Sequence, residues 1–412
     1  MDYQKLDADG VRAWLATDPE LARVLGAEPW QIDEVSDGNM NAVFLARGKA
    51  GTLCVKQALP TVRRDENWKL PLDRAGYEVA WMRAVAPYVG PLIPRLHRYD
   101  PAQYVIAMEA LSPHIIMRNG LIRGIEYPQV AAAVGRFVAA ATFATSDLAV
   151  PFGTRFAQLA EFSRNEPILR ISVDLVLTEP YFEHPRNRHT PGLEDVATSI
   201  RADGTLRAAA AAWGYKFLTC PQALIHGDLH SGSVMVTAHD ARVIDGEFAF
   251  HGPIGFDCGA FIANLLLSYF SQPGHVTPGE DRAEYAEWVL AQIQPFWTGF
   301  HDHFLALWRR GGGGDAYQPA MFADPVGQAA LEDSRQAFVA GVLADTVGFA
   351  GLEMIRRILG YAHVADFEDI ADLAVRAACE RPALAMARRL VAEPFADVAA
   401  IVRAARATIQ TM

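Results

Sequence analysis

The hydrophobic pattern changes character once along this chain, and that change limits the fold class. Between Trp30 and Gln57, short apolar runs alternate with turn residues, which is typical of antiparallel strands. Beyond Pro113, apolar residues recur at helical spacing, as in "YPQVAAAVGRFVAAATFAT" and "FEDIADLAVRAACERPALAMARRLVAE". We therefore expect an α+β protein with two lobes, a small antiparallel β lobe over residues 1–110 and a larger α-rich lobe over residues 111–412. A small-molecule site is expected in the cleft between them.

Single elements can be predicted from local signals. We expect an amphipathic helix from Asp7 to Leu25, a second helix from Arg74 to Val89, and a strand in "YVIAMEAL". The charged segment "TVRRDENWKLPLD" contains Trp68 and is predicted to be a loop. Glycines 311–314 predict an exposed, flexible loop.

Composition excludes several classes of protein. The 412 residues are 51% hydrophobic and carry a net charge of −11, with no long basic run, so we expect no nucleic-acid partner. Four separated cysteines without a CxxC pair favour neither a disulfide framework nor a zinc site. The longest apolar stretch, Gly259 to Phe270, is too short to span a bilayer, and the N-terminus lacks a signal-peptide core. We expect a soluble, cytoplasmic protein without a membrane partner.

One stretch interrupts the helical half: "LIHGDLHSGSVMVTAHDARVIDGEFAF". Its two short apolar runs, Val234–Val236 and Arg242–Ile244, predict a β-hairpin. Asp228 lies in a tight turn after a strand, where a carboxylate can orient an acceptor hydroxyl and accept its proton. Asp245 and Glu247 project to the same side in extended geometry, where a hard cation such as Mg²⁺ would offset their repulsion. The alternative is a polar hairpin in which Asp228 only caps a turn.

The histidines of this stretch, His226 and His230, lack the HExxH or Cys/His partners of a zinc site. We expect them to hydrogen-bond the loop and to orient Asp228.

The β lobe offers groups suited to phosphate. The turn "DGNMN" holds Asp37, Gly38, Asn39 and Asn41, which tolerate left-handed backbone and present N–H groups that can cover phosphates. Lys56 lies on a half-buried strand and needs an anionic partner, because a lone buried ammonium is costly. Glu78 in the following helix is a candidate, and such a pair can hold nucleotide phosphates. The alternatives are an ordinary hairpin turn and two surface charges.

Two further features have open interpretations. Arg356 and Arg357 are adjacent within an apolar helix, so they point about 100° apart and at most one can lie on its fully exposed face. They could clamp substrate hydroxyls or transferring phosphate, or form surface ion pairs. Trp68 could close over a ligand or dock on the fold.

Ordered stretches along most of the chain resemble the protein-kinase-like small-molecule kinases, and more narrowly the 5-methylthioribose kinases. They include "DGNMNAVF", "MEALSPHIIMRNGLI", "HGDLHSGS" and "EMIRRILG". Ser233 stands where broader kinases of this class carry a metal-binding Asn, in agreement with a family that uses a DxE pair. The resemblance implies that Asp228 is catalytic and that Asp245 and Glu247 bind Mg²⁺. For the nucleotide it implies a phosphate loop at Asp37, Gly38, Asn39 and Asn41, a phosphate-binding Lys56, and an adenine hinge at Met108, Glu109 and Leu111. It also implies that Arg356 and Arg357 contact the sugar or the phosphate.

The family also implies an activity. It would be ATP- and Mg²⁺-dependent phosphorylation of the anomeric hydroxyl of 5-methylthioribose, in methionine salvage, by a homodimer whose residues 1–110 bind nucleotide and whose residues 111–412 bind the sugar. A kinase for another sugar, nucleoside or aminoglycoside hydroxyl is the nearest alternative, and a non-catalytic pseudokinase is another. The sequence departs from the expected "DPEF" motif at Gly246, which keeps the acids' spacing but loosens the backbone between them.

Overall fold

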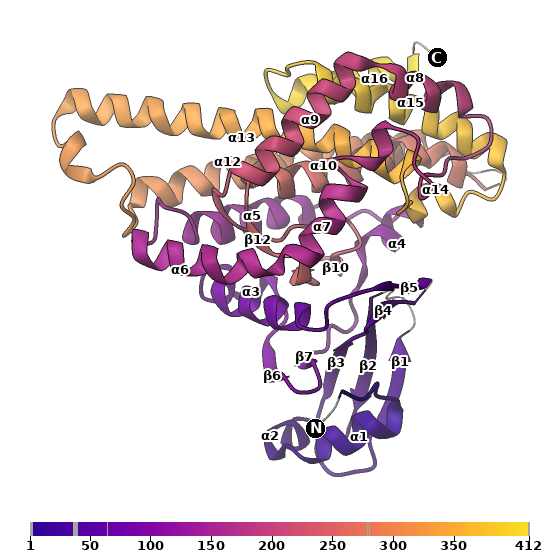
Figure 1. Cartoon of the computed structure of the whole chain (residues 1–412), viewed down its shortest axis with the longest axis vertical. Helices are drawn as coiled ribbons and strands as arrows, with labels where there is room; N and C mark the ends of the chain where they lie inside the picture. The colour runs from indigo at the N-terminus through magenta and orange to yellow at the C-terminus, as the bar shows by residue number, and fades with distance from the viewer. Residues whose placement is uncertain (1–2, 36–39, 64, 278, 280, 411–412) are drawn as a thin grey trace.

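The computed structural model describes residues 3–35, 40–63, 65–277, 279 and 281–410 (Figure 1). Its first part is a five-stranded antiparallel sheet in the order β1-β2-β3-β7-β6, preceded by two short helices. The strands are β1 Gln31–Val35, β2 Asn41–Arg47, β3 Thr52–Ala58, β6 Leu96–Asp100 and β7 Val105–Glu109. The predicted antiparallel sheet is therefore confirmed.

Both faces of this sheet are covered. On one face, helices α1 (Ala8–Ala16) and α2 (Pro19–Leu25) pack against residues such as Phe44 and Val55. On the other, helix α3 (Arg74–Val89) contacts Ile106 and Met108. Successive residues of β7 thus enter two different cores, which explains why this strand is an uninterrupted apolar run.

Three predictions for this region need correction. The single helix predicted from Asp7 to Leu25 is two helices, because Asp18 caps the backbone N–H of Glu20 at 2.8 Å and Pro19 has no N–H with which to continue the first helix. The loop that carries Trp68 is a β-hairpin, β4 Thr61–Val62 with β5 Asp65–Lys69. Strand β6 was not predicted.

The remainder is mostly helical, as predicted. Helices α5 and α12, α10 and α13, and α13 and α15 form the main packed pairs. In Figure 1, the first part of α13 extends beyond the other helices, and the chain that joins it to α12 turns back there. The helices are α4 Met117–Ile122, α5 Val130–Ala144, α6 Phe152–Phe162, α7 Glu166–Leu175, α8 Glu194–Ala202, α9 Gly204–Thr219, α10 Ile254–Ser271, α11 Ala283–Ala291, α12 Ile293–Arg310, α13 Pro325–Leu359, α14 Ala365–Glu368, α15 Leu373–Ala392 and α16 Val398–Gln410.

Short strands interrupt these helices where the sequence indicated. Strand β10 (Val234–Val236) pairs antiparallel with β11 (Ala241–Val243), which confirms the hairpin, although β11 begins and ends one residue earlier than predicted. Strand β8 (Ile115–Ile116) adds to β10, and β9 (Ala223–Ile225) pairs with β12 (Phe250–Gly252). The β10–β11 hairpin and the β9–β12 pair thus flank the segments that carry Asp228, Asp245 and Glu247.

Two helical segments contradict the expectation that no apolar stretch is long enough to span a bilayer. Ile254–His275 and Pro325–Leu359 are each long and apolar enough to cross a membrane by length and composition. Their most apolar windows are 100% and 78% buried inside the fold, as in core helices of globular domains. The loop at glycines 311–314 is tied to the segment after α5, since Gly313 N–H donates to Ala149 O at 3.0 Å and Ala316 N–H donates to Asp147 O at 3.2 Å. All four cysteines are free, as expected.

Candidate active site

The loop that carries Asp228 is fixed to the start of helix α10. Strand β9 ends at Ile225, and the Asp257 carboxylate then accepts the backbone N–H groups of His226 at 2.7 Å and Gly227 at 2.9 Å. Gly227 has φ 82°, and a Cβ there would lie 2.2 Å from Phe248 O, so this turn requires glycine. The sequence analysis missed Asp257, whose only signal is its place in the first turn of a buried helix.

Asp228 is surrounded by basic groups. Its carboxylate lies 3.3 Å from Arg356 Nη2, 3.9 Å from Arg357 Nη2 and 3.4 Å from His230 Nε2. Burial would raise the pKa of Asp228, but His230 and the two arginines outweigh it and hold the pKa well below its usual range. Asp228 is therefore ionised at neutral pH, and the expected contact with His230 is confirmed. His226 also contacts Asp228, since its Nδ1 accepts the backbone N–H of that residue at 3.3 Å, and its Nε2 lies 2.8 Å from Ile244 O.

The two arginines are held by a residue that the sequence analysis did not identify. Arg356 Nε donates to Glu353 Oε2 at 2.6 Å, and Arg357 Nε donates to Glu353 Oε1 at 2.8 Å. All three side chains are buried, so neither arginine is a surface charge. Glu353 lies three and four residues before them, which is the spacing of contacts on one helix face and was the available signal.

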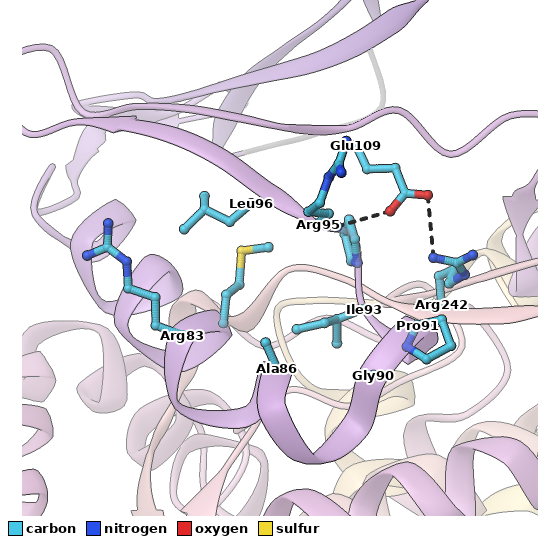
Figure 2. A pocket seen from close by; sticks show the side chains of 11 residues that line it. Arg83, Ala86, Gly90, Pro91, Ile93, Arg95, Leu96, Glu109 and Arg242 are labelled. Atoms are coloured by element: carbon cyan, nitrogen blue, oxygen red, sulfur yellow. Dashed lines mark hydrogen bonds and ion pairs between the residues drawn. The ribbon is translucent and has the colours of Figure 1, made fainter. Parts of the chain in front are cut away.

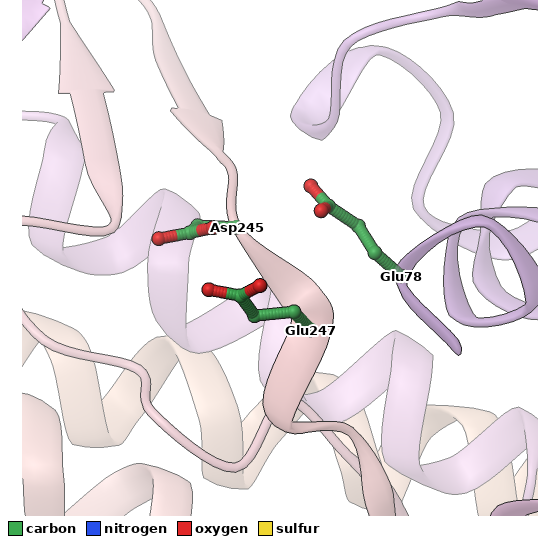
Figure 3. Close-up of side chains that lie close together, drawn as sticks. All are labelled: Glu78, Asp245 and Glu247. Carbon is green, nitrogen blue, oxygen red and sulfur yellow. The ribbon is translucent and has the colours of Figure 1, made fainter. Parts of the chain in front are cut away.

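Three carboxylates converge just beyond the end of the β10–β11 hairpin. Oxygens of Glu78, Asp245 and Glu247 lie within 4.8 Å of one another (Figure 3). The predicted geometry was wrong: Asp245 is left-handed at φ 73°, ψ 46°, and Gly246–Phe248 form a 3₁₀ turn rather than a strand. The acids converge because of this turn and because helix α3 contributes Glu78, not because alternate residues of a strand share a face.

Cations neutralise this cluster. Lys56 Nζ lies 2.7 Å from Glu78 Oε2 and is also paired with Asp245, which confirms the predicted Lys–Glu pair. Burial would lower the pKa of Lys56, but Asp245 and Glu78 outweigh it and raise the pKa above its usual range. Arg74 is fully buried and donates to Glu247 at 2.9 Å. Two cations thus face three carboxylates, and the Asp245 side chain, which is 45% exposed, remains open to water.

The cluster has donors suited to a hard divalent cation. Asp245 and Glu247 offer carboxylate oxygens, the ligands that Mg²⁺ prefers. Each carboxylate already has a partner, since Lys56 pairs with Glu78 and Asp245 and Arg74 pairs with Glu247; Asp245 is the most exposed of the three. The residues therefore fit the ion that the sequence pattern indicated.

The predicted nucleotide-binding residues divide into three groups. Asp37, Gly38 and Asn39 lie outside the described residues. Asn41 is buried and donates to Glu247 at 3.1 Å, which places it beside the acidic cluster. The hinge residues Met108, Glu109 and Leu111 end strand β7 and begin the connector, with Met108 buried against α3 and Leu111 partly buried.

Trp68 docks on the helical region. Its ring lies 5.3 Å from that of Tyr361 and 4.9 Å from the guanidinium carbon of Arg186. Tyr361 follows directly on the helix that carries the arginine pair. The Trp68 hairpin therefore reaches from the sheet to the neighbourhood of Arg356 and Arg357.

A pocket of about 560 Å³ lies against the hinge, away from these groups (Figure 2). Its walls come from α3, the connector before β6, β6 itself, and the ends of β7 and β11. Glu109 accepts from Arg95 N at 3.0 Å and lies 3.5 Å from Arg242 Nη1. None of Asp228, Asp245 or Lys56 lines this pocket, whereas the predicted hinge residue Glu109 does.

Known proteins resemble this chain over most of its length. Residues 31–296 match the phosphotransferase enzyme family. The chain is 44% identical to a methylthioribose kinase of Escherichia coli O45:K1, covering 92% of this chain and 91% of that protein. It is 37% identical to methylthioribose kinase 1 of Oryza sativa subsp. japonica, covering 94% and 91%. Among solved structures, a choline/ethanolamine kinase family protein from Mesorhizobium loti aligns with TM-score 0.44 and 18% identity, covering 97% of this chain and 99% of that one.

Proposed function

Because this chain belongs to the methylthioribose kinases of the phosphotransferase enzyme family, we propose that it transfers the γ-phosphoryl group of ATP to the anomeric hydroxyl of 5-methylthioribose. The observation that carries the proposal is the ionised Asp228 held against a buried arginine pair, close to the cluster of Asp245 and Glu247. A carboxylate of this kind can position a hydroxyl, and the arginines can offset negative charge on the phosphoryl group. The product would be the 1-phosphate of methionine salvage.

In this mechanism Asp228 accepts a hydrogen bond from the acceptor hydroxyl and receives its proton as the new P–O bond forms. The low pKa of Asp228 makes it a weak base, so it contributes first by orienting the acceptor hydroxyl. In a largely dissociative transfer, the proton of this hydroxyl becomes acidic only late, and Asp228 accepts it then. Arg356 lies close enough to contact both Asp228 and a phosphoryl oxygen beside it. A bound Mg²⁺, held by Asp245 and Glu247, would supply charge neutralisation on the nucleotide phosphates.

The binding of ATP, the phosphate donor, is inferred from the same family assignment. We assign nucleotide binding to residues 1–110 and sugar binding to residues 111–412, with the adenine at the hinge and Lys56 moving from Asp245 to a nucleotide phosphate on binding. Support comes from the buried position of Lys56 between Glu78 and Asp245, since a paired Lys there is already charged. The family resemblance leads us to propose a cytoplasmic homodimer with a closing Trp68 hairpin.

The test is an acceptor panel. Purified protein with ATP and Mg²⁺ should form ADP when 5-methylthioribose is added, with phosphate attached at C1 by ³¹P and ¹³C NMR, and Asp228→Asn should reduce kcat by roughly 10²–10⁴-fold. A response to ribose, a nucleoside or an aminoglycoside but not to 5-methylthioribose would establish the alternative acceptor. ATP binding without turnover on any acceptor would identify a pseudokinase.

A further inference from the structure

Gly246, the residue that departs from the expected motif, lies directly on an indole ring. A Cβ at Gly246 would be 2.3 Å from Cε3 of Trp81 and 2.6 Å from its Cδ2. Trp81 is 1% exposed, so the ring is enclosed and cannot swing into solvent. No side chain, proline included, fits between this turn and Trp81 as they are placed.

A proline would also oppose the backbone. The residue before a proline favours extended ψ values of about +120 to +160°. Asp245 instead has ψ 46° in the left-handed region. Glycine at 246 is therefore matched both to the indole and to the conformation of Asp245.

One face of helix α3 meets every residue of the turn at residues 245–247. Arg74, Glu78 and Trp81 are spaced by four and three residues, so they lie on the same side of the helix. Arg74 binds Glu247 at 2.9 Å, and Glu78 shares Lys56 with Asp245. Trp81 contacts the glycine between the two acids. Arg74 holds the Glu247 carboxylate directly, Glu78 is linked to Asp245 only through Lys56, and the indole sets how closely the backbone approaches the helix.

Trp81 also contacts the loop that leads to Asp228. Its ring meets that of His226 edge-on, with centroids 5.2 Å apart and planes at 85°. His226 in turn bonds Ile244 O, next to Asp245. The indole is thus enclosed by the 245–247 turn on one side and by the catalytic loop on the other.

We propose that Trp81 is a positioning residue for the metal-binding carboxylates, with Gly246 as its matched partner. The inference rests on the proposed function, in which Asp245 and Glu247 hold Mg²⁺. Mg²⁺ demands near-octahedral geometry with oxygens at about 2.0–2.1 Å, so small displacements of two carboxylates weaken binding. A change at Trp81 or Gly246 therefore acts on metal affinity, whereas acceptor binding at Asp228 is much less affected.

The test uses Gly246→Ala, Trp81→Leu and the double variant. We expect each single change to raise the half-saturating Mg²⁺ concentration roughly 10-fold, as supporting residues of metal sites do when altered. In the double variant the smaller Leu side chain makes room for the new methyl group, so the shift should be smaller than the product of the two single shifts. KM for 5-methylthioribose should change less than about threefold. Mn²⁺ binding in the presence of ADP, followed by electron paramagnetic resonance, provides a readout that needs no turnover and should shift in parallel.

The matched control is Phe304→Leu, another fully buried aromatic residue, which packs on Phe143 and Phe300. It should lower Tm by a similar amount and leave the Mn²⁺ affinity unchanged. Wild-type Mn²⁺ affinity in Gly246→Ala, or equal affinities in Trp81→Leu and Phe304→Leu, would overturn the inference; Trp81→Phe replaces Trp81→Leu if the latter does not fold. A wild-type protein that does not phosphorylate 5-methylthioribose, while Gly246→Ala weakens Mn²⁺ binding, would refute the proposed function and support Trp81 as the positioning residue.

Discussion

Replacing Glu353 by Gln should destabilise the protein strongly, although Glu353 contacts no predicted ligand. The carboxylate is 4% exposed and accepts hydrogen bonds of 2.6 and 2.8 Å from two buried guanidinium groups. Gln keeps the shape but removes the charge, which leaves Arg356 and Arg357 with only Asp228 to oppose them. Breaking a buried ion pair on one side costs about 3–5 kcal/mol, and we expect a loss in that range.

The same substitution should slow the reaction. Arg356 Nη2 lies 3.3 Å from Asp228, and its direction is set by the bond from its Nε to Glu353. A guanidinium misplaced by about 1 Å can cost on the order of 100-fold, so we expect kcat to fall roughly 10–100-fold with a smaller change in KM for ATP.

The chain offers a matched control on the same helix. Glu332 also accepts from two arginines, Arg309 and Arg335, but it is far more exposed, with 38% of its side chain accessible. Exposed pairs contribute about 0–1 kcal/mol, so Glu332→Gln should be nearly neutral. Urea unfolding with a constant m-value measures both free energies. A Glu353→Gln protein as stable as Glu332→Gln would refute this account of the arginine clamp.

Two further predictions concern buried charges. Lys56→Met should raise KM for ATP at least 10-fold. It should also lower the free energy of unfolding by about 3 kcal/mol, because Glu78 and Asp245 lose their shared cation. A variant as stable as the wild-type protein at neutral pH would contradict this prediction. His251 is buried, and neither ring nitrogen has a hydrogen-bond partner, so burial lowers its pKa to about 3. The unfolded chain, with a His pKa near 6.5, takes up a proton that the folded protein does not, so stability falls as pH drops from about 6.5 towards 3. His251→Phe should remove roughly 2 kcal/mol of this loss at pH 5, measured by urea unfolding at pH 7 and pH 5.

The fold was predictable where local signals were strong. Helix α3 has the predicted bounds of Arg74 and Val89, and the hairpin of β10 and β11 lies within one residue of its prediction. Where prediction failed, a neighbouring element decided the outcome. The break at Asp18 and Pro19 was visible as a cap and a proline, but it was overridden by the amphipathic pattern on both sides.

The chemical groups of the site could be predicted from the sequence better than their positions in space. A buried Lys needs an anion, and this requirement correctly paired Lys56 with Glu78. Arg74 and Asp257 were not predicted because each is defined by a contact between residues far apart in the sequence. Glu353 was not predicted although its spacing from Arg356 and Arg357 on one helix was a local signal. The left-handed Asp245 was also missed, because positive φ is uncommon even for Asp, although Asp adopts it more often than most residues other than glycine.

The contacts of Trp68 have a consequence for the timing of turnover. Its hairpin is a separate two-stranded sheet between β3 and α3, whereas Tyr361 and Arg186 belong to the helical region, so the two regions cannot separate at this point without breaking both contacts. An aromatic pair and a cation–π contact together contribute about 1–3 kcal/mol. That range corresponds to a shut state favoured about 5- to 150-fold over an open one. Under the proposed function, this factor adds to the pairing of Lys56 with Asp245 and of Arg74 with Glu247, which also join the two regions.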